Sequence, residues 1–77
     1  MLAYILLTTE TGFTPQVLRA IKKFKNVRGA HAVYGVYDIV AKVEAESLNN
    51  LEEIVTSKVR HLNKVRSSLT LIGMEDP

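Results

Sequence analysis

The residues best suited to bind a small polar molecule lie together in the segment Tyr34-Gly35-Val36-Tyr37-Asp38. A glycine turn leaves backbone polar groups exposed, the tyrosines provide aromatic walls, and the Asp38 carboxylate can accept hydrogen bonds from an ammonium group. The same residues also suit a plain β-hairpin with aromatic cross-strand packing and an aspartate that caps its own turn. Residue types alone leave both interpretations open.

Few other residues are candidates for catalysis or cofactor binding. Neither His31 nor His61 has a second histidine or a glutamate at metal-ligand spacing, so we expect no metal site and no catalytic residue. A His31 base beside Asp38 is the one enzymatic alternative. The chain has no cysteine, and its four glycines form neither a G-x-G-x-x-G motif nor a Walker loop. We therefore expect no cofactor.

Length and charge narrow the class of protein. With 77 residues, the chain allows one domain, residues 1–77. The net charge of +2 is too small to indicate nucleic-acid binding, and the basic residues between Arg19 and Arg28 suit a solvated helix face, so we expect no direct nucleic-acid partner. The uncharged opening run, Met1 to Thr9, is too short to span a membrane and lacks the basic start of a signal peptide. We expect a cytoplasmic protein without a membrane partner.

Apolar periodicity predicts six elements in the order strand, helix, strand, strand, helix, strand. The first helix begins at Thr14-Pro15, with Thr14 as N-cap and an apolar stripe reaching Phe24; the second has Ser47 as N-cap and a stripe ending at Leu62. The strands cover residues 2–8, 27–34, 37–45 and 65–74, and a polar tail covers 75–77. The two-residue turn Gly35-Val36 joins the middle strands, with a positive φ expected at Gly35.

A repeat with an offset of 38 residues relates the two halves of the chain. It aligns Val17 with Val55, Ile21 with Val59, and the segment that begins at Val27 with the one that begins at Val65. Two copies of strand-helix-strand predict an α+β fold of the ferredoxin-like βαββαβ type. Its four-stranded antiparallel sheet carries both helices on one face, as in a dimeric α-β sandwich.

Because the offset is even, we assign all odd-numbered strand residues to the helix-facing side of the sheet. This set is Ile5, Leu7, Val33, Ile39, Ala41, Val43, Leu69 and Leu71, with His31 on the same side. The opposite face then carries Tyr34 and the polar Ser68 and Thr70 beside a group of apolar residues: Leu2, Tyr4, Leu6, Ala30, Ala32, Val40 and Ile72. This face is too apolar for a free surface, so we expect this group to form a homodimer interface between two sheets.

One known family matches this pattern. Val27, Ala30, the run from Val33 to Val40, and Val65 followed by Ser68-Leu69-Thr70 resemble the effector-binding domain of the leucine-responsive and asparagine-responsive regulators. This is the RAM domain of the Lrp/AsnC family, and the resemblance covers essentially the whole chain. The chain begins at the first strand of that domain, so it resembles the stand-alone form without the helix-turn-helix.

The resemblance implies a non-enzymatic module of transcription regulation that binds an amino acid or a related effector. Such domains bind the effector where dimers meet and assemble into rings, commonly octamers. By position, the implied effector-binding residues are Tyr34, Gly35, Tyr37 and Asp38 from the hairpin, with Ser68 and Thr70 from the last strand. Tyr34 replaces a residue that is usually small and polar. Full-length regulators of the family are implied partners through mixed assembly.

Two other classes of function remain as alternatives. One is a small dimeric enzyme of the same fold, which a deep pocket around His31 would favour. The other is a purely structural oligomerisation unit that binds no ligand.

Overall fold

The computed structural model describes residues 1–74, and the polar tail expected at 75–77 lies outside the described residues. The elements are β1 (Leu2–Thr9), α1 (Thr14–Ile21), β2 (Val27–Ala32), β3 (Ile39–Glu44), α2 (Leu48–Ile54), the π-helical turn η1 (Val55–Val59) and β4 (Val65–Ile72). The predicted order of strands and helices is confirmed.

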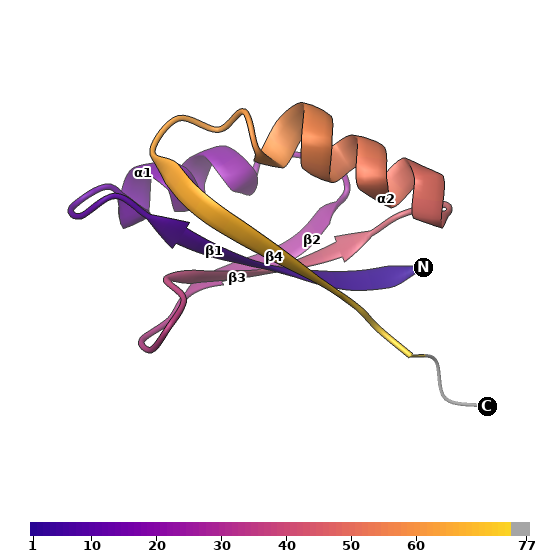
Figure 1. Cartoon of the computed structure of the whole chain (residues 1–77), viewed down its shortest axis with the longest axis horizontal. Helices are drawn as coiled ribbons and strands as arrows, with labels where there is room; N and C mark the ends of the chain where they lie inside the picture. The colour runs from indigo at the N-terminus through magenta and orange to yellow at the C-terminus, as the bar shows by residue number, and fades with distance from the viewer. Residues whose placement is uncertain (75–77) are drawn as a thin grey trace.

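All strand pairs in the sheet are antiparallel, in the order β2-β3-β1-β4. Both helices lie on one side of this sheet, and its other side is left open in the chain (Figure 1). The repeat accounts for the layout, because its two equivalent strands β1 and β3 are central while β2 and β4 form the edges. The structure therefore has the predicted ferredoxin-like α+β fold.

The helix boundaries agree with the sequence in one case and differ in two. Ser47 caps α2 as predicted, since its Oγ accepts a hydrogen bond from the Asn50 N–H at 3.1 Å. The prediction for Thr14 is wrong: Phe13 is the N-cap of α1, and the Thr14 hydroxyl instead bonds the Thr9 hydroxyl at 2.7 Å. After Ile54 the helix widens into η1, where the Arg60 N–H donates to the Val55 carbonyl at 3.0 Å.

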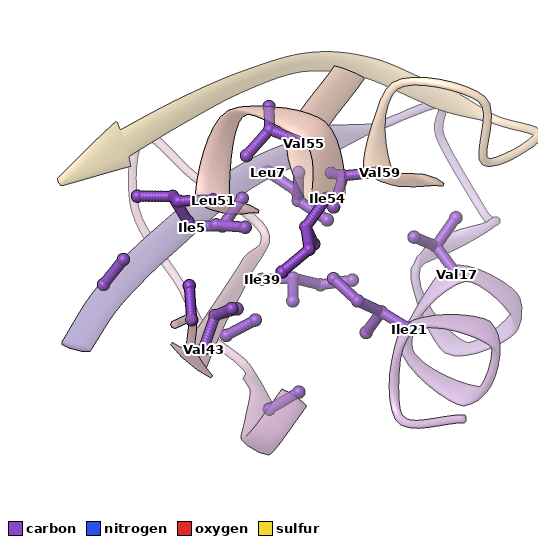
Figure 2. Packing of buried hydrophobic residues seen from close by; sticks show 14 residues of the cluster. Ile5, Leu7, Val17, Ile21, Ile39, Val43, Leu51, Ile54, Val55 and Val59 are labelled. Carbon is purple, nitrogen blue, oxygen red and sulfur yellow. The ribbon is translucent and has the colours of Figure 1, made fainter. Parts of the chain in front are cut away.

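The core lies between the sheet and the two helices (Figure 2). Ile5, Leu7, Ile39, Ala41 and Val43 are completely buried, which confirms the predicted core side of β1 and β3. The helices cover them with residues that the repeat aligns: Val17 and Val55, and Ile21 and Val59, are all buried. The 38-residue offset thus corresponds to two equivalent halves packed on one core.

The predicted faces of β2 and β4 are wrong. Leu69 and Leu71, expected in the core, are 44% and 48% exposed, whereas Ala30, expected on the opposite face, is only 3% exposed. Val33, also expected in the core, is exposed and lies beyond the end of β2. In both edge strands, the residues predicted for the opposite face therefore lie on the helix-facing side.

Strand register explains these errors. Paired residues of an antiparallel sheet share a face, and the edge strands β2 and β4 pair odd-numbered residues with even-numbered ones of their central neighbours. Core residues Ile39 and Ile5 lie opposite Ala32 and Thr70, and His31 lies opposite Val40 on the other face. An even repeat preserves parity between equivalent strands, but it says nothing about parity between an edge strand and a central strand.

The side of the sheet away from the helices, called the open face below, is consequently different from the predicted one. Leu2, Tyr4, Leu6 and Val40 lie on it as expected, because they pair with one another or with Lys42 and Glu44. Ala30, Ala32 and Ile72 lie on the helix-facing side instead. On β4, Leu69 and Leu71 lie on the open face opposite Leu6 and Tyr4 of β1, so this face stays strongly apolar.

Replacing Ile39 by alanine tests the core assignment. We expect Ile39→Ala to lower the free energy of unfolding by about 2–5 kcal/mol, because it removes a fully buried side chain and leaves a cavity. Val36→Ala, at an exposed loop position, should change it by less than about 0.5 kcal/mol. Urea denaturation at one fixed protein concentration measures both values, and equal losses would contradict the assignment.

Candidate ligand-binding site

The hairpin between β2 and β3 is longer than predicted but keeps the predicted pairing. The connection covers the six residues from Val33 to Asp38, and the Val33 N–H donates to the Asp38 carbonyl at 2.9 Å. Gly35 has a φ of 136°, a value that other residues rarely adopt, as the sequence predicted. Tyr34 is fully exposed while Tyr37 is half-buried, so the two tyrosines do not form a cross-strand pair within β2 and β3.

Asp38 fastens this hairpin to the end of β1. Its backbone N–H donates to the Leu7 carbonyl at 2.8 Å, and its Oδ2 accepts the Thr9 N–H at 2.8 Å. The Thr9 hydroxyl lies 3.4 Å from the same oxygen and 2.7 Å from the Thr14 hydroxyl at the start of α1. The carboxylate therefore satisfies a donor of β1 instead of capping its own turn.

Three hollows lie along β4. The most open, of about 590 Å³, is lined by Glu10, Thr11, Val65 and Arg66. The second, of about 350 Å³, contains Ser68 and is bounded by Arg60; the third, of about 300 Å³, contains Thr70 and lies between β4 and α2. Ser68 and Thr70, expected on the opposite face, therefore face the helix side, in agreement with their pairing to Leu7 and Ile5.

One chain does not bring the predicted binding residues together. Leu7 of β1 pairs with Ile39 on one side and with Ser68 on the other, so the hairpin and β4 are two strand spacings apart, about 9–10 Å. The hairpin also projects away from the helices (Figure 1), whereas Ser68 and Thr70 face them. None of the three hollows along β4 is lined by Tyr34, Gly35, Tyr37 or Asp38.

Sequence reasoning missed the contribution of the second helix. Glu52, Thr56 and Arg60 line the hollow that contains Thr70, together with apolar residues of α2. The spacing of four residues between Glu52 and Thr56 places these two on one side of a helix, and this signal was present in the sequence. Arg60 joins them through the π-helical turn, which the sequence did not indicate. The meaning of the spacing depended on the correct face of β4, because only then does Thr70 lie opposite them.

The histidines do not build a separate site in the described part of the chain. His31 is exposed on the open face, not on the predicted inner face, and His61 is exposed after η1. None of the three hollows along β4 is lined by His31, so none of them supports the enzymatic alternative. Within residues 1–74, no three histidine or carboxylate side chains converge as a metal site would require.

No helix among residues 1–74 has the length and apolar character needed to cross a membrane.

Comparison with known proteins identifies the family. The model of the Lrp/AsnC ligand-binding domain matches residues 2–77, and this chain belongs to that family. A crystal structure of FFRP-DM1 is similar with 32% identity and a TM-score of 0.91, over 95% of this chain and 97% of that one.

Among curated proteins, the regulatory protein AsnC of Haemophilus influenzae is 27% identical over 62 residues, which is 80% of this chain and 41% of that protein. The chain thus spans less than half the length of this curated relative. The fold also matches the structure of the transcriptional regulator NMB0573 from Neisseria meningitidis in complex with L-Met, with 13% identity and a TM-score of 0.87, over 97% of this chain and 50% of that one.

Two substitutions of Asp38 separate its structural role from its charge. Asp38→Ala leaves the partly buried Thr9 N–H without its acceptor, so we expect the free energy of unfolding to fall by about 1–3 kcal/mol. Asp38→Asn keeps an acceptor oxygen and should lose less than half as much. Urea denaturation checks this, and equal losses for both variants would show that the bond to Thr9 is not what stabilises the hairpin.

Proposed function

We propose that this chain is an effector-binding and self-assembly domain in transcription regulation, and that its effector is an amino acid. The observation that carries the proposal is a distance within one chain: the hairpin residues lie too far from Ser68 and Thr70 to line the same hollow. Residues that the family resemblance assigns to one ligand are two strand spacings apart, and no hollow along β4 includes both groups. A ligand that contacts both groups must therefore lie between two chains.

The open face supports self-association as the first step. Leu2, Tyr4 and Leu6 run along the central strand, flanked by Val40 on β3 and by Leu69 and Leu71 on β4. Apolar side chains on three neighbouring strands form a continuous strip that no helix covers in the described chain. Continuous apolar strips of this kind mark interfaces between proteins, so we assign the strip to a homodimer that packs sheet against sheet.

The predicted dimer interface changes in composition on this basis. Of the predicted set, the proposal keeps Leu2, Tyr4, Leu6 and Val40 and adds the two leucines of β4. Ala30, Ala32 and Ile72 leave the set, because their register places them on the helix-facing side. The dimer leaves the hairpin and the β4 hollows free for contacts with further dimers, which suits assembly into an octamer or a similar ring.

Asp38 is the proposed partner of the effector's ammonium group. Its Oδ2 is occupied by Thr9, and within residues 1–74 its Oδ1 accepts no hydrogen bond. A carboxylate already held in place loses little rotational freedom when its free oxygen binds a ligand, which favours affinity. Gly35 and Tyr37 lie beside it on the hairpin, while Ser68 and Thr70 contribute hydroxyls from the second chain.

The partners follow from the same assignment. We propose a cytoplasmic location, since the curated relative is a regulatory protein, and mixed assembly with full-length Lrp/AsnC-type regulators through the same surfaces. No direct contact with nucleic acid or membrane is part of the proposal, and neither is a catalytic step.

A charge on the open face should prevent dimerisation. We expect Leu71→Glu to give a monomer at micromolar concentration, because two carboxylates would be buried among apolar side chains of the opposing sheet. Leu48→Glu is the matched control: Leu48 is 47% exposed against 48% for Leu71, but it lies on α2. It should remain at least dimeric. Native mass spectrometry decides, and a monomeric parent protein would overturn the interface.

An amino-acid panel tests the ligand. We expect at least one of the standard amino acids to raise the melting temperature of the 77-residue protein, and Asp38→Asn to weaken its binding by about tenfold or more, because the charge-assisted hydrogen bond is lost. Glu53→Gln removes an exposed carboxylate on α2 that lines none of the three hollows, and should bind normally.

Calorimetry then measures the dissociation constants. Unchanged affinity in Asp38→Asn would refute the role of the carboxylate, and no binding by any amino acid would favour the purely structural oligomerisation unit.

A further inference from the structure

Arg60 separates two of the hollows along β4 and lines both. On one side it bounds the hollow that contains Ser67 and Ser68, and on the other the hollow that contains Thr56 and Thr70. Arg60 thus lies beside hydroxyl groups from the helical side and from the strand, and Arg66 is a second cation in the lining of the hollow that contains Ser68. The predicted effector-binding residues all lie on the hairpin or on β4. Arg60, which follows η1, is therefore an addition to that set.

The Arg60 guanidinium is available to bind an anion. The side chain is exposed, and no carboxylate within residues 1–74 lies at ion-pair distance from it; the ion pair formed there joins Arg28 and Glu44. Arginine presents N–H donors in a planar fork that matches a carboxylate in two parallel hydrogen bonds. The Thr56 hydroxyl already donates to the Glu52 carbonyl at 2.8 Å, and the Ser67 hydroxyl is paired with Thr8. The hydroxyls of Ser68 and Thr70 are the ones that can donate a further hydrogen bond to the same group.

The π-helical turn is what directs Arg60 toward β4. In an uninterrupted α-helix, Arg60 would point about 80° away from Glu52 around the axis, because each residue turns the helix by roughly 100°. The bond from the Arg60 N–H to the Val55 carbonyl spans five residues and inserts one extra residue into the turn. The rotation brings Arg60 back into line with Glu52, and both line the hollow beside Thr70.

The hollow beside Arg60 is apolar over most of its remaining lining. Leu48, Leu51 and Val55 come from the helical side and Ile72 from β4. Its volume of about 300 Å³ is at the lower end for small-molecule sites and suits a ligand the size of one amino acid. Glu52 is the one carboxylate in the lining, so a negatively charged ligand side chain would be repelled there.

We propose that this hollow is the recognition site for the carboxylate and the side chain of the effector, with Arg60 binding the carboxylate and the apolar lining selecting an uncharged, apolar side chain. The inference rests on the proposed function, because Ser68 and Thr70 belong to both. It adds Arg60 as the carboxylate-binding residue and Glu52 as the residue that rejects acidic amino acids. The ligand class is accordingly an α-amino acid with an aliphatic or similarly apolar side chain.

Binding of L-leucine and of L-leucinamide to the full chain tests the role of Arg60. The amide has the same side chain and ammonium group but no carboxylate. We expect the parent protein to bind L-leucine about tenfold or more tightly than the amide, and Arg60→Gln to lose that preference, with affinity for L-leucine reduced by about tenfold to a hundredfold. Arg60→Lys should fall between them, because it keeps the charge but not the fork.

Lys58→Gln is the matched control. Lys58 lies on η1, two residues before Arg60, and also carries a positive charge. It lines neither hollow, so its loss should leave both dissociation constants unchanged. Circular dichroism of each variant confirms folding before calorimetry. A general effect of surface charge would appear equally in both variants and would overturn the assignment to Arg60.

Side-chain selectivity is tested with L-alanine and L-glutamate in the same experiment. Each methylene buried in the hollow should tighten binding by roughly fourfold, so L-leucine should bind well above L-alanine. L-Glutamate should bind weakly to the parent protein and more tightly to Glu52→Gln. Equal binding of leucine and alanine would overturn the apolar hollow as the side-chain site.

The outcomes separate this inference from the proposed function. If an amino acid binds and depends on Asp38 but is indifferent to Arg60→Gln, the proposed function stands and the inference is wrong. If no amino acid binds to the parent protein, both are overturned. If Arg60→Gln changes only the oligomer size in native mass spectrometry, the hollow receives a second copy of the chain instead of a ligand, and the inference is again wrong.

Discussion

The hydrogen bonding of β1 to β3 on one side and to β4 on the other determines which residues the molecule hides and which it shows. The two central strands pair at equal parity, as with Ile5 opposite Ala41. Each edge strand pairs with its central neighbour at opposite parity, as with Thr70 opposite Ile5 and Ala30 opposite Ala41. Each edge strand therefore alternates in the opposite sense from the central strand beside it. The apolar strip on the open face and the hydroxyls that face α2 are two results of this one register.

The hairpin depends on the same central strand. Asp38 is joined to Leu7 and Thr9 by its backbone and by its carboxylate, and Thr9 in turn contacts Thr14 at the start of α1. Asp38, which its type and position predict to bind a ligand, thus has a structural partner of its own. The two roles are compatible, because a carboxylate has two oxygens and Thr9 uses only one of them. Immobilising the first oxygen positions the second.

The second helix adds a feature that neither the repeat nor the hairpin contains. In the first half of the chain α1 ends at Ile21, whereas the equivalent position in the second half, Val59, ends a π-helical turn. Both residues are buried, so the wider turn keeps the core contact while it rotates the residue that follows. The halves are equivalent in their cores and different at the surface, where Arg60 meets β4.

The amino-acid sequence by itself determined the order of elements, the 38-residue repeat, the cap at Ser47, the positive φ at Gly35 and the buried side of β1 and β3. These follow from local periodicity and local backbone geometry, which neighbouring residues control. Tertiary structure alone decided the faces of β2 and β4, the contact of Asp38 with Thr9 across 29 positions, and the placement of Arg60 in the lining of the hollows that contain Ser68 and Thr70. The physical reason is that strand register is a relation between distant segments: shifting it by one residue exchanges the two faces while every local pattern stays the same.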